Sequence, residues 1–443
     1  MTDFLIKRLP YDLSSHAGLT FIGKYLKRIN INALIDPAFP VRSGIANSDI
    51  LKSYLGLLCL GKNDFDAIEK FRGNAFFMRA LGLQAVPSSP TLRQRLDTYA
   101  SDWFDLAAQI NQALLSSRIE GRAIDFGALS CGYTPLDLDT FSMDNSDTQK
   151  ELVGRTYAGV DGYCPLAVYL GRLGYCLELA LRPGVQHSAR ESEYNLERAL
   201  PMAASLVKGP LLVRADAGFC SLKLMQEISA QGTALGREMA FIIKWNRRTT
   251  PVETIAACKT ADAGAAWQTL RLGKRECVWL EVLDLVDVGN AANPARRVYR
   301  LTQRTIDKHG NALLLPEYVL EGWTTTLPGR FSPAEIIALY ADHATHEQFH
   351  AEFKSDMDLE RLPGDKFDTN YLVCRLAAVA IESVAPDWTK HPERARCARA
   401  PPGPAPAHPG GAAGDDVQSR PHDPPCRALG TRPGRGRQRL CGV

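Results

Sequence analysis

Apolar residues recur at helical spacing along the first quarter of the chain. Between Leu19 and Ser117 they follow a period of three to four residues, as in the run from Ile50 to Leu58. No strand-like alternation competes with this period. The pattern therefore predicts a helical N-terminal region over residues 1–120.

One helix inside this region begins at a recognisable start signal. Ser88 is a good N-cap residue, and Pro90 suits the first turn of a helix. The helix that follows would present Arg93, Gln94 and Arg95 outward. A solvated helix face and a binding face both fit these residues.

The pattern changes near residue 123 to short runs rich in β-forming residues. Two charged helical stretches interrupt these runs, Ser188–Val207 and Ser221–Gln231, and the second is expected to end at Gly232. The order of three strands, helix, strand, helix, strand predicts a mixed sheet with helices packed on its faces, an α+β or α/β fold. The predicted strands are Leu136–Phe141, Cys164–Leu170, Tyr175–Leu181, Leu211–Ala215 and Ala240–Trp245.

The second half divides into an insertion, two helices and a tail. Strand-like pieces joined by polar turns predict a β-rich inserted subdomain over residues 246–330, between parts of one domain at residues 121–245 and 331–385. Ser332 opens a predicted helix that runs to about Met357, and Asn370–Ser383 predicts another. Residues 386–443 hold 11 of the 27 prolines and almost no periodic apolar positions, which predicts a disordered tail. We interpret this tail as the product of a frameshift in a GC-rich gene.

Composition narrows the class of protein only slightly. With 45% hydrophobic and 23% charged residues the chain is an ordinary globular protein, and a net charge of +3 permits a polyanionic partner without arguing for one. The 11 cysteines form no C-x-x-C pair, so we expect reduced, buried cysteines. No signal-peptide core and no run near the roughly 18 apolar residues of a membrane span is present, which predicts a cytoplasmic protein.

Acidic residues at two predicted strand ends are candidates for chemistry. In the first strand, alternation puts Asp137 and Asp139 on the face opposite Leu136 and Leu138. In the fourth, an apolar strand stops at Asp216, which is followed by Ala217 and Gly218. Solubilising acids at a strand end and a simple turn cap are the alternative interpretations.

The helix predicted after Ser332 carries a polar stripe. Offsets of −7, −4 and +7 from Glu347 place Tyr340, His343, Glu347 and Lys354 on one helical face. A solvated charged face would explain the acids and the lysine. It explains the tyrosine less well.

These motifs together resemble the bacterial insertion-sequence DDE transposases. The helix is similar to that family's Tyr-Arg-Glu-Lys signature at Tyr340, Glu347 and Lys354, with His343 in the arginine position. Thr140 after Asp139 resembles the family's first catalytic strand and favours Asp139 over Asp137. The run from Arg214 to Phe219 resembles its second-aspartate motif. The resemblance covers about residues 123–385, and more loosely the helical N-terminus.

The resemblance implies an RNase H-like catalytic domain in which Asp139, Asp216 and Glu347 bind Mg²⁺ or Mn²⁺, with two ions expected. It implies cutting at the element's ends, transfer of the freed 3′-hydroxyl to target DNA, and a homodimer in a synaptic complex on the bacterial nucleoid. Tyr340, His343 and Lys354 would contact phosphates, and Arg93 and Arg95 would face DNA from the N-terminal region. A catalytically inactive or domesticated DNA-binding protein and a metal-dependent nuclease without strand transfer stay open as alternatives.

Overall fold

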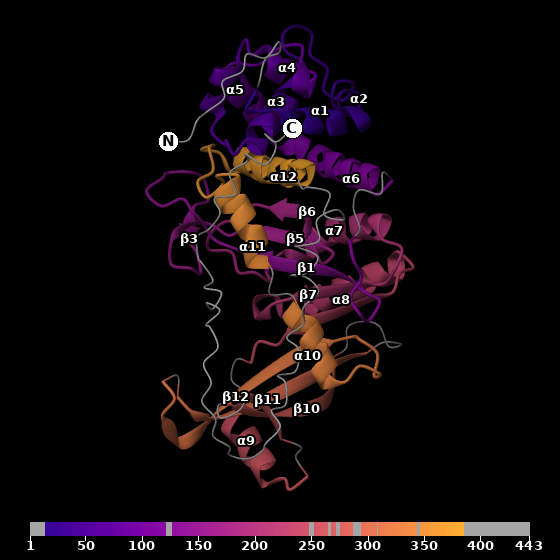
Figure 1. Cartoon of the computed structure of the whole chain (residues 1–443), viewed down its shortest axis with the longest axis vertical. Helices are drawn as coiled ribbons and strands as arrows, with labels where there is room; N and C mark the ends of the chain where they lie inside the picture. Colours follow the sequence, from indigo (N-terminus) through magenta and orange to yellow (C-terminus); the bar gives the residue numbers. More distant parts are fainter. Residues whose placement is uncertain are drawn as a thin grey trace, which may run out of the picture.

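The computed structural model arranges a helical cap above a long sheet (Figure 1). It describes residues 14–120, 126–247, 252–264, 267–271, 275–286, 294–307, 309–342 and 346–384. The predicted tail therefore lies outside the described residues. The helices of the N-terminal region are α1 (Leu19–Arg28), α2 (Ile31–Ile35), α3 (Asn47–Cys59), η1 (Phe65–Phe71), α4 (Ala75–Leu81), α5 (Ser89–Tyr99), η2 (Ser101–Trp103) and α6 (Phe104–Glu120).

A mixed sheet forms the centre of the molecule. Its first five strands lie in the order β6-β5-β1-β7-β8, with β1 antiparallel to β5 and parallel to β7. This is the RNase H-like arrangement that the resemblance implies, and it confirms the predicted mixed sheet. The strands are β1 (Thr134–Thr140), β5 (Leu166–Leu170), β6 (Tyr175–Ala180), β7 (Leu211–Ala215) and β8 (Met239–Lys244).

Helices cover both faces of this sheet. Alternate residues of β7 point to opposite sides, so that Leu211 and Val213 pack under α7 (Ser192–Leu206) and α8 (Leu222–Ala234), whereas Leu212 packs toward α10 (Pro333–Ala341). A separate small sheet of β2 (Met143–Asp144), β4 (Asp161–Tyr163) and β3 (Gly154–Arg155) follows β1. These short strands are absent from the sequence prediction because two or three residues give no periodicity.

The strands of the insertion continue the central sheet. Residues Trp323 to Thr325 of β12 (Ala312–Thr325) pair antiparallel with β8, and β11 (Ala295–Ile306), β10 (Arg275–Val286) and β9 (Gln268–Arg271) follow. The inserted segment is thus joined to the central sheet by main-chain hydrogen bonds, which cover the open edge of β8. The helix α9 (Val252–Ala261) packs on β12.

The prediction of a single helix from Ser332 to Met357 is wrong. A capping box between Ser332 and Glu335 starts α10 as predicted, but α10 ends at Ala341 with Asp342 as its C-cap. The chain resumes as α11 (His346–Ala351) and a π-helical segment, η5 (Glu352–Asp356). The helix α8 also runs past Gly232 to Ala234, so that glycine does not end it.

The N-terminal helices and the last helix share one apolar core. The helix α12 (Phe367–Val384) packs on α6, α3 and β6, and its Leu376 and Val379 are fully buried with Leu58 and Ile110. The helical cap therefore includes α12, which follows the central sheet in the sequence (Figure 1).

Two further observations concern the described residues as a set. No helix among them has the length and apolar character to cross a membrane. The described cysteines form no disulfide with one another, and most are buried or half-buried as expected; Cys258 on α9 is exposed.

Candidate active site

Asp139 and Asp216 meet at the carboxyl ends of two adjacent parallel strands. The last paired residues of β1 and β7 are Leu138 and Ala215, so the two aspartates are the next residues along each strand. Burial, and then the charge of Asp139, raise the pKa of the Asp216 carboxyl above its ordinary value. The two carboxylates therefore repel each other at one point of the sheet.

Asp137 has a different role from Asp139. Arg214 donates from Nε to Asp137 Oδ1 at 2.6 Å and from Nη2 to Oδ2 at 2.7 Å, and both side chains are buried. A bidentate pair of this kind engages both carboxylate oxygens. At Asp139, in contrast, the Thr140 amide donates to Oδ1 at 2.8 Å, and Oδ2 lies 3.7 Å from His350 Nε2. The geometry therefore favours Asp139 over Asp137 as the first candidate carboxylate. The sequence alone favoured Asp139 only because Thr140 follows it.

Local turns fix the direction of Asp216. Its Oδ1 accepts a hydrogen bond from the Gly218 amide at 2.9 Å, so it does cap the turn η3 (Ala217–Phe219). A Cβ at Gly218 would lie 3.0 Å from that same oxygen and 3.1 Å from Ser188 Oγ. Ser188 Oγ also shares a hydrogen bond with Thr140 Oγ1 at 2.9 Å. The loop before α7 therefore lies against the ends of both β1 and β7.

Two tyrosines face the pair of aspartates. Burial first, then Asp216 and Asp139, raise the pKa of Tyr340 on α10 well above its ordinary value. The Tyr157 hydroxyl donates to Thr140 O at 3.0 Å, and Tyr157 is 70% exposed. Both hydroxyls stay protonated at neutral pH, so both can donate hydrogen bonds.

Arg214 ties α10 to the sheet. Besides holding Asp137, it donates from Nη1 to the carbonyl of Leu339 at 2.7 Å and lies 3.7 Å from Asp342. These contacts fix the end of α10, and with it Tyr340, beside Asp216.

The helix α11 brings the third candidate acid to the same region. Glu347 is its second residue, and the Glu347 side chain lies outside what the structure describes. His350 follows three residues later and approaches Asp139, and its ring stacks on Phe141 at 4.4 Å. Residues three apart lie on one helix face, so the backbone position of Glu347 shares a face of α11 with that of His350. Figure 1 shows α11 crossing the sheet beside β1 and β5.

The remaining predicted contact residues are dispersed. Lys354, in η5, pairs with Glu360 at 3.0 Å and does not share a helix with Tyr340, so the predicted stripe is wrong for this pair. His343 lies outside the described residues. On α5, Arg93 is exposed over the ring of Phe65.

Arg95 is not directed outward as predicted. It is half-buried and donates to Asn47 Oδ1 at 2.5 Å. Its backbone position on α5 suggested exposure, but α3 supplies an acceptor within reach.

Sequence reasoning assigned no role of their own to three residues at this site, although it quoted Arg214 as part of the second-aspartate motif. Arg214 could have been found, since it stands on a predicted strand beside the one that carries Asp137. His350 could have been found from its spacing to Glu347. Tyr157 gives no signal, because the short strands around it leave no pattern.

A family model for the transposase DDE domain, group 1, matches residues 11–390. This chain belongs to the DDE transposase family. It is a DNA transposase, and the chemistry of this family is DNA cleavage and strand transfer. The family generally uses divalent metal ions.

Two further comparisons accompany the family model. No curated protein matches this DDE transposase. A cryo-EM structure of a piggyBac transposase synaptic complex with hairpin DNA is 12% identical, with a TM-score of 0.36, over 83% of this chain and 74% of that one. At this level of similarity the family assignment rests on the family model.

Proposed function

We propose that Asp139, Asp216 and Glu347 are the catalytic carboxylates of this transposase and hold two Mg²⁺ or Mn²⁺ ions. The observation that carries the proposal is the meeting of Asp139 and Asp216 at adjacent strand ends. The contact of His350 with Asp139 supports Glu347 as the third member, since both belong to α11.

The donor chemistry fits a divalent cation. Carboxylate oxygens are the ligands that Mg²⁺ and Mn²⁺ prefer. A cation would stabilise the ionised Asp216 carboxylate against its burial and against the charge of Asp139, which together raise its pKa. Among the described side chains, no group of three or more His, Cys, Asp or Glu residues is placed to bind a metal ion. The side chain of Glu347 lies outside the described part of the chain. When bound, the ions stabilise the attacking and leaving oxygens of an in-line displacement at phosphorus.

The proposed substrate is the end of an insertion sequence. Water attacks the phosphorus at the element's end, the P–O bond breaks, and the element keeps a 3′-hydroxyl. That hydroxyl then attacks a phosphorus of target DNA and displaces a target 3′-oxygen. Both steps are direct displacements, so no covalent protein intermediate forms.

The protein's own part in these steps is to bind and orient phosphate. Tyr340 is the best-placed donor, because its protonated hydroxyl faces Asp216 and Asp139. Lys354 would have to leave Glu360 to reach DNA. We keep His343 as a proposed weak phosphate contact in the position of the family's arginine. Arg93 stays a proposed surface contact, while Arg95 is engaged with Asn47.

Two ends must be processed together, so we propose that two copies act in a synaptic complex. Light scattering of the protein with and without duplexes that carry the element ends tests this. A complex of two chains and two duplexes is expected, and a complex that stays at one chain per duplex under cleavage conditions would contradict it.

Cleavage of labelled DNA that carries the sequences flanking the gene tests the catalytic assignment. We expect Mg²⁺- or Mn²⁺-dependent cleavage and joining that Asp139→Asn, Asp216→Asn and Glu347→Gln each abolish while DNA binding persists. Asp161→Asn is the matched control, since Asp161 is an exposed acid on β4.

The other functions give different results in the same assay. Specific binding without cleavage by the unchanged protein would indicate an inactive or domesticated DNA-binding protein. Cleavage without joining would indicate a nuclease.

A further inference from the structure

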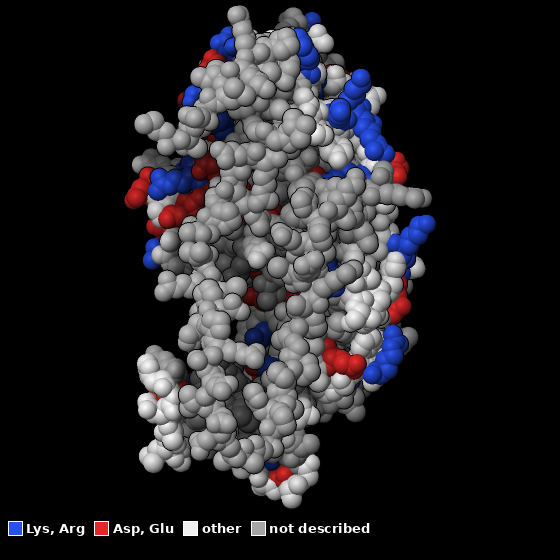
Figure 2. Space-filling model, in the orientation of Figure 1, with Lys and Arg blue, Asp and Glu red and all other residues white. Residues whose placement is uncertain are grey.

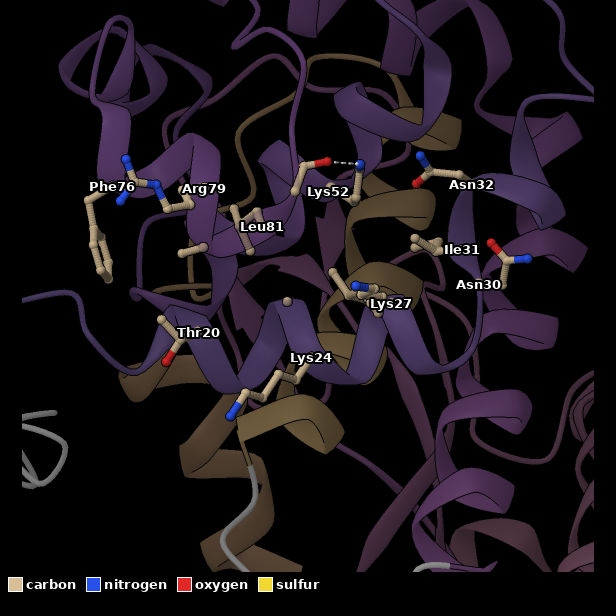
Figure 3. Close-up of a pocket in the computed structure, with 14 residues that line it drawn as sticks. Thr20, Lys24, Lys27, Asn30, Ile31, Asn32, Lys52, Phe76, Arg79 and Leu81 are labelled. Carbon is tan, nitrogen blue, oxygen red and sulfur yellow. Dashed lines mark hydrogen bonds between the residues drawn. The ribbon is translucent and has the colours of Figure 1, made fainter.

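A cleft lies in the helical cap, away from the aspartates. It has a volume of about 560 Å³ and runs between α1, α2, α3 and α4 (Figure 3). Its charged lining residues are Lys24 and Lys27 from α1, Lys52 from α3 and Arg79 from α4. No acidic residue lines it.

The charges at the rim of the cleft are available to a ligand. Lys24, Lys27 and Arg79 are exposed, and none forms an ion pair within the part of the chain that the structure describes. The only other contact of these three cations is that of Lys24 with the Phe21 ring at 5.8 Å, among the described residues. Figure 2 shows Lys and Arg side chains along the upper right of the molecule, where Figure 1 labels α1 and α2.

The wall of the cleft is rigidly built. Lys52 is 2% exposed, and its ammonium donates to Gly82 O at 2.7 Å and pairs with Asp49 at 2.9 Å. Asp49 also accepts hydrogen bonds from the amides of Gln84 and Ala85, and these bonds fix the loop after α4 to α3.

The floor of the cleft is the close contact of two helices. A Cβ at Gly23 would lie 1.7 Å from Ala80 O, so only glycine allows α1 and α4 to approach this closely. Because of that approach, the lysines of α1 and Arg79 of α4 border one opening. The packing of the cap therefore fixes the backbone positions that carry the three cations.

We propose that this cleft binds the sugar-phosphate backbone of duplex DNA outside the segment being cut. A group of exposed cations with no counter-charge among the described residues attracts a polyanion and releases its counterions. Asn30 and Asn32 add neutral donors along the same rim. Cations spread over two helices suit successive phosphates of a backbone better than one small anion, which converging donors would hold.

This face differs from the one that the sequence suggested. On α5, Arg95 is held by Asn47, whereas the cleft cations on α1 and α4 have no such partner among the described residues. The inference rests on the proposed function in one respect, that DNA is the substrate.

Salt-dependent binding of a fluorescent duplex to the full chain tests the cleft. The triple variant Lys24→Gln, Lys27→Gln, Arg79→Gln should lower the steepness of log K against log salt by about two to three, because each lost phosphate contact contributes about 0.9. Its affinity in low salt should fall roughly tenfold or more. Lys223→Gln, at an exposed lysine on α8, is the matched control and should change neither quantity.

Three comparisons keep the result unambiguous. The charge-preserving variant Lys24→Arg, Lys27→Arg, Arg79→Lys should bind like the unchanged protein, and an unchanged melting temperature of the Gln variant excludes unfolding. Wild-type affinity and salt dependence in the Gln variant would overturn the proposal. So would a mononucleotide that raises the melting temperature of the unchanged protein only, since the ligand would then be small. Asp216→Asn tests the catalytic assignment separately, because it should abolish cleavage and leave the salt dependence unchanged.

Discussion

At the scale of single residues, the site separates acids that hold the fold from acids available for chemistry. Asp137 and Asp139 are two residues apart on one strand face, yet Asp137 is paired with Arg214 and Asp139 stands at the strand end beside Asp216. Tyr340 adds a donor whose pKa is raised by burial and by both site aspartates. The neutral hydroxyl beside a pair of acids is suited to hold a phosphate oxygen.

Replacing Tyr340 tests that donor. Tyr340→Phe should lower the single-turnover cleavage rate by about 10- to 100-fold, because a hydrogen bond to a charged oxygen contributes about 1.5–3 kcal/mol. DNA affinity should change little, since the rest of the interface is intact. Tyr194→Phe, at an exposed tyrosine of α7, is the control. A cleavage rate equal to that of the unchanged protein would remove Tyr340 from the site.

At the scale of elements, Arg214 is the link between the sheet and α10. Asp137→Asn should lower the free energy of unfolding by about 3 kcal/mol or more, because it leaves a buried guanidinium without its counter-charge. The double variant Asp137→Leu, Arg214→Met should recover most of that stability but still cleave slowly, since α10 loses its anchor at Leu339.

Urea unfolding and the cleavage assay measure the two effects. Asp161→Asn is again the control, because its pair with Arg155 is exposed and should contribute at most about 1 kcal/mol. If the double variant cleaved at the rate of the unchanged protein, the anchoring of α10 would be irrelevant to the reaction.

The elements also show what the sequence could predict. Alternation predicted β1, a continuous apolar run predicted β7, which is buried on both faces, and helical period predicted the helices around them. The break after Ala341 could not be predicted, since Asp342 lies near Arg214 and Arg172, which are distant in sequence. Arg95 was misplaced for the same reason, because its partner Asn47 belongs to another helix. Spacing within one helix carries no information about contacts between helices.

At the scale of the whole molecule, α12 joins the helical cap to the sheet through a buried acid. Glu382 is buried between α6 and β6, where it accepts from the Cys176 amide at 2.7 Å. Burial raises the pKa of Glu382 from 4.5 to about 8, although Arg118 acts in the opposite direction and Glu352 in the same one. The Arg118 guanidinium itself donates to the carbonyl of Glu382.

The pH dependence of stability follows from this shift. The folded chain keeps a proton on Glu382 that the unfolded chain releases above its ordinary pKa of 4.5, so stability present below pH 4.5 is lost as the pH rises toward 8. In Glu382→Gln the side-chain amide oxygen can still accept from Cys176, and the variant no longer titrates there. Denaturant unfolding at several pH values should therefore give a flatter profile for the variant, with the largest gain over the unchanged protein near pH 8. Parallel profiles would mean that Glu382 is ionised in the fold and that the cap and the sheet are joined without a protonated acid between them.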